Sequence, residues 1–296
     1  MALPPGSEDM HVDMHVEVRA YAELGDFLPP TDGRPGTVVR RPLRPHQTVK
    51  DLVEAAGIPH TEVDLVVVDG EPVGLDHRPR PGDRLAVYPT LRTLAPGGRL
   101  QPPPAGEVRF VADVHLGRLA RLLRLLGFDT RGAGDRPGID LPDVDDATIA
   151  AVAEEEGRIV LTRDRGLLKR SRVARGVYVR SDEPEDQAVD VVRHLGVVDR
   201  LRPMTRCLRC GGPLVPAAKA DVLDQLEPLT RAHHQDFRRC TRCGRAYWPG
   251  AHRPGLESLI TRLTGRLAGQ AVLQRPGGLE DDDRGTSGRR ACGPAP

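Results

Sequence analysis

The apolar and polar positions of the first ninety residues predict a small α+β unit. Residues alternate from His15 to Ala20 as in a half-buried strand, and the apolar run 64–68 ends in the hairpin dipeptide Asp69-Gly70. Between them, 48–56 has the pattern of a short helix. We predict Thr48 as its N-cap, Gly57 as its C-cap, and further strands at 37–41 and 84–88. The predicted order is ββαββ, within residues 14–92.

The pattern then changes to alternating strands and helices, after a Pro- and Gly-rich stretch at 95–106 that is typical of a semi-rigid linker. Leu116, Leu119, Leu123 and their neighbours at 120 and 126 fall on one helix face. This alternation indicates a multi-domain α/β protein whose central unit, residues 107–198, has a mostly parallel sheet. Its strands are expected at 108–112, 128–131, 158–162 and 177–180, and its further helices at 146–156 and 184–195.

Two Cys-x-x-Cys pairs separated by 29 residues follow this unit. Each pair can point two thiolates at one ion, and four thiolates complete the closed tetrahedral shell of a structural zinc. A redox pair or a chance spacing is the alternative. We predict a zinc ribbon at residues 199–254, and a helix at 256–273 behind it. The predicted zinc ligands are Cys207, Cys210, Cys240 and Cys243.

Charge is unevenly distributed, although the whole chain carries only +1. Residues 200–253 hold ten Arg and one Lys against four acidic residues, a net charge of +7, whereas 107–198 carry 15 basic and 17 acidic residues. The basic excess lies with the cysteines, where Arg209, Arg239 and Arg242 are candidates for contact with the phosphates of a nucleic acid. Tyr247 and Trp248 are candidates for base stacking. A solvated arginine surface with Trp248 packed on the zinc site is the alternative.

Nothing at the N-terminus resembles a signal peptide, and no apolar run reaches the roughly 18 residues of a membrane helix. We therefore expect a cytoplasmic protein without a membrane partner. Residues 275–296 have the composition of a disordered tail.

Two acidic residues follow strands of the predicted parallel sheet. Asp113 comes after 108–112 and Asp164 after 158–162, and Asp146 begins the helix at 146–156. Because the carboxyl ends of parallel strands line one edge, these carboxylates are expected to converge. Oxygen ligands with remaining water positions suit Mg²⁺ or Mn²⁺.

Structural roles for these aspartates remain open from the residues alone. Asp146 is equally suited to be an N-cap, with Asp143 and Asp145 as competitors for the metal. Asp164 is equally suited to a turn in which it pairs with a neighbouring arginine.

Longer motifs carry a family resemblance. The segments FVADVHLGRLARLLRLLGFDT and DDATIAAVAEEEGRIVLTRDRGLLKR, with the trailing ribbon CLRCGG…RCTRCGRAYWPGAH, resemble the PIN-like ribonuclease domain named for the C-terminus of the Mut-seven exonuclease. The segments TVKDLVEAAGIPHTEVDLVVVDGEPV and RPGDRLAVYP resemble the ubiquitin-like β-grasp domain that precedes this nuclease.

The resemblance implies a metal-dependent ribonuclease in which Asp113, Asp146 and Asp164 hold one cation. It also implies that Thr162 holds a metal-bound water, with a strand-end hydrogen bond as its alternative role. The products implied are a 5′-phosphate and a 3′-hydroxyl.

Arg118 and Arg121 lie off the leucine face of the first central helix, together with Arg124. They are candidates to guide the RNA backbone toward Asp113, and the alternative is a solvated helix face, favoured more for Arg124 than for Arg118.

The β-grasp unit is expected to act as an interaction or substrate-presenting module, with a protein partner. Sulfur carriers work through a C-terminal Gly-Gly, whereas Gly97-Gly98 is internal here. The polar loop 59–62 is either a recognition loop or a simple connection. Two functions therefore stand beside the nuclease: a non-catalytic RNA- or ribosome-binding adaptor, and a β-grasp sulfur-transfer accessory.

Overall fold

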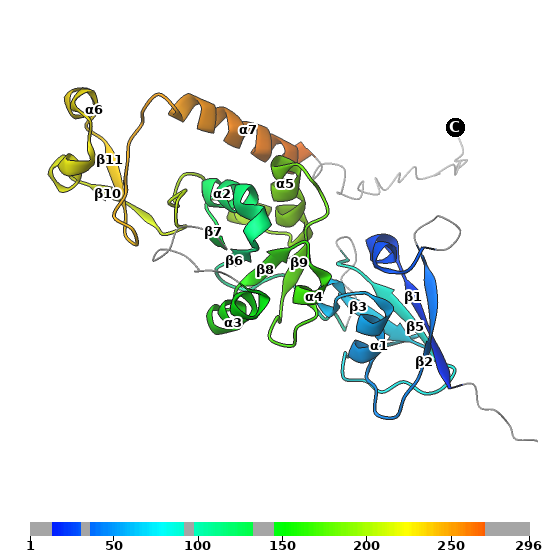
Figure 1. Cartoon of the computed structure of the whole chain (residues 1–296). Coiled ribbons are helices and arrows are strands. Elements are labelled where there is room, and N and C mark those ends of the chain that lie inside the picture. The colour runs from blue at the N-terminus through cyan, green and yellow to red at the C-terminus, as the bar shows by residue number, and fades with distance from the viewer. Residues whose placement is uncertain (1–13, 31–35, 92–97, 133–144, 270–296) are drawn as a thin grey trace, which may run out of the picture.

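The computed structural model describes residues 14–30, 36–91, 98–132 and 145–269. The predictions for Asp143 and for the 275–296 tail lie outside the described residues. The chain forms a β-grasp unit, a central α/β unit and a cysteine-bearing module (Figure 1). The predicted fold class is confirmed in all three parts.

The β-grasp unit is a five-stranded mixed sheet that packs on one helix. Its strands are ordered β2-β1-β5-β3-β4, with β1 and β5 parallel and the other pairs antiparallel. Thr48 and Gly57 cap α1 as predicted, and Gly57 has φ +111°, a conformation that glycine adopts without strain. The three-residue strand after Asp69-Gly70, β4, was not counted in the predicted order. The elements are β1 (His15–Ala20), a 3₁₀ turn η1 (Ala22–Phe27), β2 (Val38–Pro42), α1 (Val49–Ala56), η2 (His60–Glu62), β3 (Leu65–Val68), β4 (Glu71–Val73) and β5 (Arg84–Tyr88).

The central unit is a four-stranded parallel sheet ordered β7-β6-β8-β9, with helices on both faces. The wholly parallel pairing confirms the prediction from strand–helix alternation. The elements are β6 (Arg109–Ala112), η3 (Val114–Leu116), α2 (Gly117–Leu125), β7 (Asp129–Gly132), α3 (Asp146–Glu156), β8 (Ile159–Thr162), α4 (Arg165–Leu168), β9 (Gly176–Tyr178), α5 (Pro184–His194) and η4 (Val198–Arg200).

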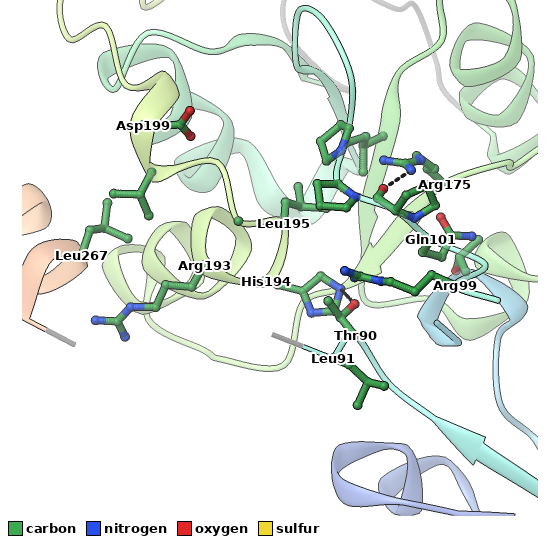
Figure 2. Close-up of a pocket in the computed structure, with 18 residues that line it drawn as sticks. Thr90, Leu91, Arg99, Gln101, Arg175, Arg193, His194, Leu195, Asp199 and Leu267 are labelled. Carbon is green, nitrogen blue, oxygen red and sulfur yellow. Dashed lines mark hydrogen bonds between the residues drawn. The ribbon is translucent and has the colours of Figure 1, made fainter. Parts of the chain in front are cut away.

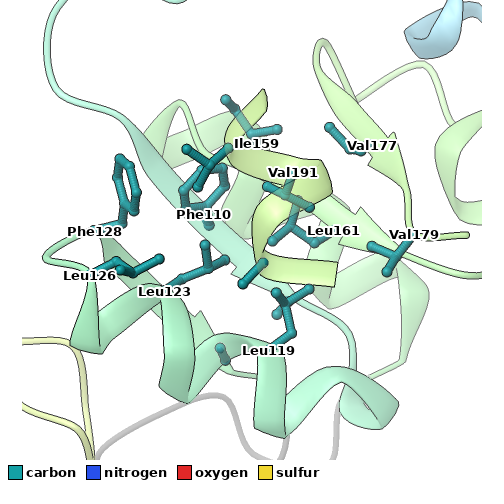
Figure 3. Close-up of a cluster of buried hydrophobic side chains, with 14 of the residues drawn as sticks. Phe110, Leu119, Leu123, Leu126, Phe128, Ile159, Leu161, Val177, Val179 and Val191 are labelled. Atoms are coloured by element: carbon teal, nitrogen blue, oxygen red, sulfur yellow. The ribbon is translucent and has the colours of Figure 1, made fainter. Parts of the chain in front are cut away.

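Successive side chains of β6 point to opposite faces of this sheet. Phe110 points to the face covered by α2 and α5, where it packs edge-on against Phe128 with 5.5 Å between ring centroids (Figure 3). Val111 points to the opposite face, under α3 and α4. The predicted leucine face of α2 is buried here, since Leu119 and Leu123 are fully inaccessible to solvent.

The cysteine module is a three-stranded antiparallel sheet, ordered β10-β11-β12, that carries two helical turns between its first two strands. A small core of Val222, Leu226, Phe237 and Ala246 holds the first of these turns, η5, against the sheet. The 29 residues between the cysteine pairs are thus folded structure. The elements are β10 (Leu214–Ala217), η5 (Lys219–Gln225), α6 (Pro228–His233), β11 (Phe237–Cys240) and β12 (Ala246–Tyr247).

A long helix, α7 (Arg253–Gly269), returns from this module to the central unit and lies against α5 (Figure 1). Leu263 and Leu267 enter the core beneath α2 and α5. Arg262 forms a bidentate pair with Glu185 at 2.7 and 2.9 Å. The helix begins three residues earlier than predicted, and its described part ends at Gly269. None of the helices described, α7 included, is both long and apolar enough to cross a membrane.

The β-grasp unit docks on strand β9 through its loop 59–62, so this loop binds another part of the same chain. Glu62 is only 2% exposed, and its carboxylate accepts from the Tyr178 backbone N–H at 2.7 Å and pairs with Arg180 at 3.0 Å. The His60 ring contacts the Val173 carbonyl at 3.1 Å.

The segment predicted as a semi-rigid linker is docked as well. Its described part is attached to Asp64, a fully buried carboxylate that accepts from the Gln101 N–H and pairs with Arg99. On the other side, Arg175 donates to the Pro102 carbonyl. Composition predicted a spacer because proline and glycine dominate it, but a buried charge outside the segment fixes its path.

Candidate functional site

Thr162 joins two of the predicted acidic residues at the carboxyl edge of the central sheet. Strands β6 and β8 are neighbours, so the residues that follow them emerge side by side. The Thr162 hydroxyl donates to Asp113 Oδ2 at 2.7 Å and accepts from the Asp164 backbone N–H at 2.9 Å. The predicted convergence of Asp113 and Asp164 thus has a local cause, because one fully buried hydroxyl bonds both segments.

Both aspartates also begin helical turns. Asp113 Oδ1 accepts from the Val114 N–H at 2.6 Å, and Asp164 Oδ1 accepts from the Gly166 N–H at 2.6 Å. These bonds fix the carboxylates at helix N-termini, where a negative charge is favoured. The side chain of Asp113 is half-buried and that of Asp164 is exposed.

Asp164 makes no ion pair with its arginine neighbours, contrary to the alternative raised from sequence. Arg163 turns to Asp182 at 2.7 Å. Arg165 stacks on the Phe27 ring, 4.9 Å from its centroid, and donates to backbone carbonyls of the β-grasp unit. Both arginine side chains point away from Asp164 because they bind acceptors outside this turn.

Asp146 is the first residue of α3, and the N-cap is its neighbour Asp145, which accepts from the Thr148 N–H at 2.8 Å. Asp146 Oδ2 lies 3.6 Å from Arg170 Nη2. Among the described residues, the three aspartates do not form a group whose ligand oxygens all lie within 4.8 Å of one another. Their oxygens have the chemistry of a Mg²⁺ or Mn²⁺ donor set, and Asp146 joins the other two only if it leaves Arg170.

The four predicted zinc ligands lie close enough together to share one metal ion. Their sulfur atoms all lie within 4.8 Å of one another, with Cys207–Cys243 at 3.7 Å and Cys210–Cys240 at 3.5 Å. A tetrahedral site with Zn–S bonds of about 2.3 Å has S···S edges of about 3.8 Å. The cysteine cluster therefore fits a zinc ion. Gly212 completes the fit, because a Cβ there would stand 2.9 Å from Cys240 Sγ.

Tyr247 contacts this cluster through its hydroxyl group. Its hydroxyl contacts Cys207 Sγ at 3.0 Å and accepts from the Leu208 N–H at 3.1 Å. Burial raises the pKa of the Cys207 thiol, but hydrogen bonds from Tyr247 and from backbone N–H groups outweigh it, so the pKa is lowered to about 7. Burial raises the pKa of Cys210 and of Cys243. Cys207 is thus the thiol most ready to bind metal as a thiolate.

The arginines of this module that were predicted to contact RNA differ in their exposure to solvent. Arg239 is exposed and donates to the Gly244 carbonyl at 3.2 Å, and Arg242 is exposed and donates to the Cys210 carbonyl at 2.7 Å. Arg209 is half-buried. Trp248 is 37% exposed, which leaves part of its ring open to solvent.

On α2, Arg118 and Arg121 are exposed, as a phosphate-guiding role requires. Arg124 is not a solvated residue, and that expectation was wrong. It is 1% exposed and donates to the carbonyls of Thr130 at 2.8 Å and of Leu208 and Arg209 at 3.2 and 2.9 Å. A guanidinium with five donors can hold several carbonyls at once, so Arg124 ties the first cysteine pair to the central unit.

Sequence reasoning passed over Asp182, which follows β9 at the same edge of the sheet. Its carboxylate holds Arg163, on the strand end that leads into Asp164. The signal was present, since Asp182 stands after a predicted strand as Asp113 and Asp164 do.

Comparison with known proteins decides the family. The model of the Mut7-C RNAse domain matches residues 108–260, just over half of the chain. The chain belongs to this family. A second model, Mut7-C ubiquitin, matches residues 13–95, over the β-grasp unit. The resemblance identified from sequence motifs is confirmed for both parts, and family membership supports a nuclease function for the central unit.

One curated relative agrees with this assignment. The human protein described as "Exonuclease mut-7 homolog" is 32% identical over 179 residues, which cover 54% of this chain and 19% of that protein. The chain therefore spans about a fifth of the length of this relative. Two crystal structures of small archaeal modifier protein 1 (SAMP1) from Haloferax volcanii match 26% of this chain at 23% and 25% identity, with TM-scores of 0.21 and 0.20, and cover 96% and 98% of those chains.

Proposed function

We propose that this protein is a metal-dependent ribonuclease of PIN-like type that hydrolyses RNA phosphodiester bonds at the carboxyl edge of the central sheet. The observation that carries the proposal is the hydrogen-bonded set of Asp113, Thr162 and Asp164 on neighbouring parallel strands. It lies within a family described as an RNAse domain. Ligands of parallel α/β sheets bind beyond the carboxyl ends of the strands, where these residues lie.

Asp113, Asp164 and Asp146 would hold the Mg²⁺ or Mn²⁺ ion. When bound, such a cation supplies charge stabilisation at the phosphate and an activated water. The residues of the chain prepare that site: Thr162 orients the Asp113 carboxylate, and the turn at Gly166 orients Asp164. Arg170 Nη2 lies 3.6 Å from Asp146 Oδ2 and offsets part of the negative charge of this carboxylate.

The RNA backbone would be bound by exposed arginines of α2 and of the cysteine module. Arg118 and Arg121 extend from α2, which follows Asp113 after the three-residue turn η3. On the zinc module, Arg239 and Arg242 are exposed, and Arg209 lies between the first two cysteines. Each phosphate contact releases counterions, so the proposal includes affinity that falls steeply with salt. A cytoplasmic location and a separate protein partner for the β-grasp unit stay predictions.

The test is cleavage of single-stranded RNA by the purified chain with Mn²⁺, compared with Asp164→Asn. Asparagine can still accept from the Gly166 N–H, so this variant keeps the turn and removes only the charge. Asp69→Asn, in the exposed hairpin turn of the β-grasp unit, is the matched control. We expect cleavage in the parent and the control, and none in Asp164→Asn.

Cleavage that survives Asp164→Asn, or that continues in EDTA at unchanged zinc content, would overturn the proposed site. If no RNA is cleaved but RNA still binds in EDTA, the adaptor hypothesis holds instead. Mass spectrometry of the chain from cells tests the third hypothesis, since a sulfur-transfer role requires cleavage after Gly98.

A further inference from the structure

A cavity of about 440 Å³ lies where the β-grasp unit, the 99–104 segment and the central unit meet. It is lined by Ile159 and Gly176, the first residues of β8 and β9. Asp113 and Asp164 follow the opposite, carboxyl ends of the strands. The cavity is therefore at the other end of the sheet from the proposed nuclease site and is a separate place on the molecule.

One wall of the cavity is held in place by a buried charge. Asp64 accepts from the backbone N–H groups of Leu91 at 3.2 Å and Gln101 at 3.0 Å, and its Oδ2 lies 2.7 Å from Arg99 Nη2. Leu91, Arg99 and Gln101 all line the cavity. The wall is thus preorganised, which reduces the entropy lost when a ligand binds.

Cationic and polar groups gather at one end. Arg99 extends toward His194 and Thr90, whereas Arg193 points away from them (Figure 2). The Thr90 hydroxyl lies 3.4 Å from His194 Nε2. Because Asp64 offsets the charge of Arg99, the net positive charge at this end comes from Arg175 and from His194 when protonated. The guanidinium groups provide planar forks that suit phosphate oxygens.

Thr61 is a second, independent sign of a ligand. Its side chain lines the cavity and is 4% exposed, and its hydroxyl has no hydrogen-bond partner among the described residues. A buried polar group without a partner costs free energy, so native proteins rarely leave one unless something outside the chain bonds it.

The other end of the cavity is mixed, since Asp199 and Arg193 line it together with Leu195, Val198 and Leu267. A volume of this size takes a ligand of nucleotide dimensions, and a carboxylate beside apolar side chains suits a body that carries hydrogen-bond donors. We propose that the cavity binds a small phosphate monoester of the nucleoside monophosphate class, with its phosphate toward Arg175, His194 and Thr61. Such a ligand would touch the β-grasp unit, the 99–104 segment and α5 together and would stabilise their docking.

The test is calorimetric titration of the full, zinc-loaded chain with AMP, adenosine and inorganic phosphate, without added Mg²⁺ or Mn²⁺. We expect AMP to bind once per chain, inorganic phosphate to compete with it, and adenosine to bind more weakly than AMP. Arg175→Gln should weaken AMP binding about tenfold or more, as loss of a charged hydrogen bond does. Arg172→Gln is the matched control, because Arg172 pairs with exposed Glu154 and does not line the cavity.

A further variant separates binding from folding. Thr61→Val keeps the side-chain shape and removes the unpartnered hydroxyl, so we expect unchanged or higher thermal stability together with weaker AMP binding. The proposal is overturned if adenosine binds as tightly as AMP, if neither Arg175→Gln nor Thr61→Val weakens AMP binding, or if AMP binding disappears in Asp164→Asn. The last result would assign the nucleotide to the nuclease edge.

Discussion

The Thr162 hydroxyl lies between two acidic segments: it donates to Asp113 Oδ2 at 2.7 Å while accepting from the Asp164 N–H at 2.9 Å. A hydroxyl has one proton to donate and lone pairs to accept, so Thr162 acts as donor and acceptor at once. Which bond uses the proton is fixed, because the backbone N–H of Asp164 can only donate. The hydroxyl proton must therefore point at Asp113, which remains an acceptor.

Thr162→Val tests this relationship. Valine has the shape of threonine but leaves the Asp164 N–H and Asp113 without their shared partner. We expect RNA cleavage to fall about 10- to 100-fold, as a misplaced catalytic group does. We also expect a loss of about 1–3 kcal/mol in the free energy of unfolding, because buried donors and acceptors are left unpaired. Cleavage rates with Mn²⁺ and urea unfolding measure the two effects.

Thr162→Ser is the control, since it retains the hydroxyl and should keep most of the activity. Full cleavage by the valine variant would show that Thr162 serves only the end of strand β8.

Removal of one cysteine tests the zinc site. Cys240→Ser takes one of four thiolates from a shell that needs all four, so we expect the bound zinc to fall from about one ion per chain toward none. Elemental analysis of the dialysed protein measures this. Cys292→Ser removes a cysteine outside the cluster and should leave the zinc content unchanged. Equal zinc in both variants would mean that the cluster is not the metal site.

Tyr247→Phe tests the hydrogen bond to the ligand sulfur. Tyr247 lowers the pKa of Cys207 toward about 7, so its loss raises that pKa and leaves more thiol at neutral pH. Zinc binds the thiolate and releases the proton. We expect zinc affinity at pH 7 to fall about 10- to 100-fold, in the range found when a group that orients a metal ligand is removed.

The sign of the pH effect follows from the same linkage. The difference between Tyr247→Phe and the parent should shrink as the pH rises above the raised Cys207 pKa, because the thiolate then forms in both proteins. Competition with a chromophoric zinc chelator at several pH values gives the two affinities. A difference that does not change with pH would contradict the role assigned to Tyr247.

Arg124→Lys tests the connection between the zinc module and the central unit. Lysine keeps the charge, but a single ammonium cannot reach the Thr130, Leu208 and Arg209 carbonyls together. We expect the free energy of unfolding to fall by about 1–3 kcal/mol, the cost of leaving buried polar groups unpaired. Urea unfolding measures it. Arg121→Lys, one turn earlier and exposed, should stay within about 0.5 kcal/mol of the parent.

Glu62→Ala tests the docking of the β-grasp unit. Without the carboxylate, the Tyr178 N–H and Arg180 lose their acceptor across the boundary. We expect faster hydrogen exchange at Tyr178 and a lower melting temperature. Glu71→Ala, an exposed position in β4, is the control and should change neither. Unchanged exchange at Tyr178 in Glu62→Ala would mean that other contacts hold the two units together.

Local signals predicted those parts of the fold that neighbours along the chain determine. The leucine spacing of α2 gave its buried face, Thr48 and Gly57 gave the ends of α1, and the cysteine spacing gave the cluster. In each case the residue types and their separation carry the geometry, so no distant contact was needed.

The parts that could not be predicted depend on long-range partners. Arg124 and the exposed Arg121 look alike in sequence, and only the carbonyls of Leu208 and Arg209, more than eighty residues away, make one of them a buried bridge. The sequence around Glu62 has the pattern of a polar connection, and only the fold brings its carboxylate to the Tyr178 N–H and to Arg180. The same holds for the acidic edge, where strand ends predicted Asp113 and Asp164 but not the pairing of Asp146 with Arg170.

The bond from the Tyr178 N–H to Glu62 covers part of an open edge of the central sheet. Strand β9 is the outermost strand on its side of the central sheet. An outer strand offers unpaired backbone groups to strands of other molecules, which is a common route to aggregation. Here a side chain of the β-grasp unit occupies one of those groups, and loop 59–62 covers the strand. The ubiquitin-like domain thus covers this sheet edge, and we expect a fragment of the central unit made without it to be prone to join its copies along β9.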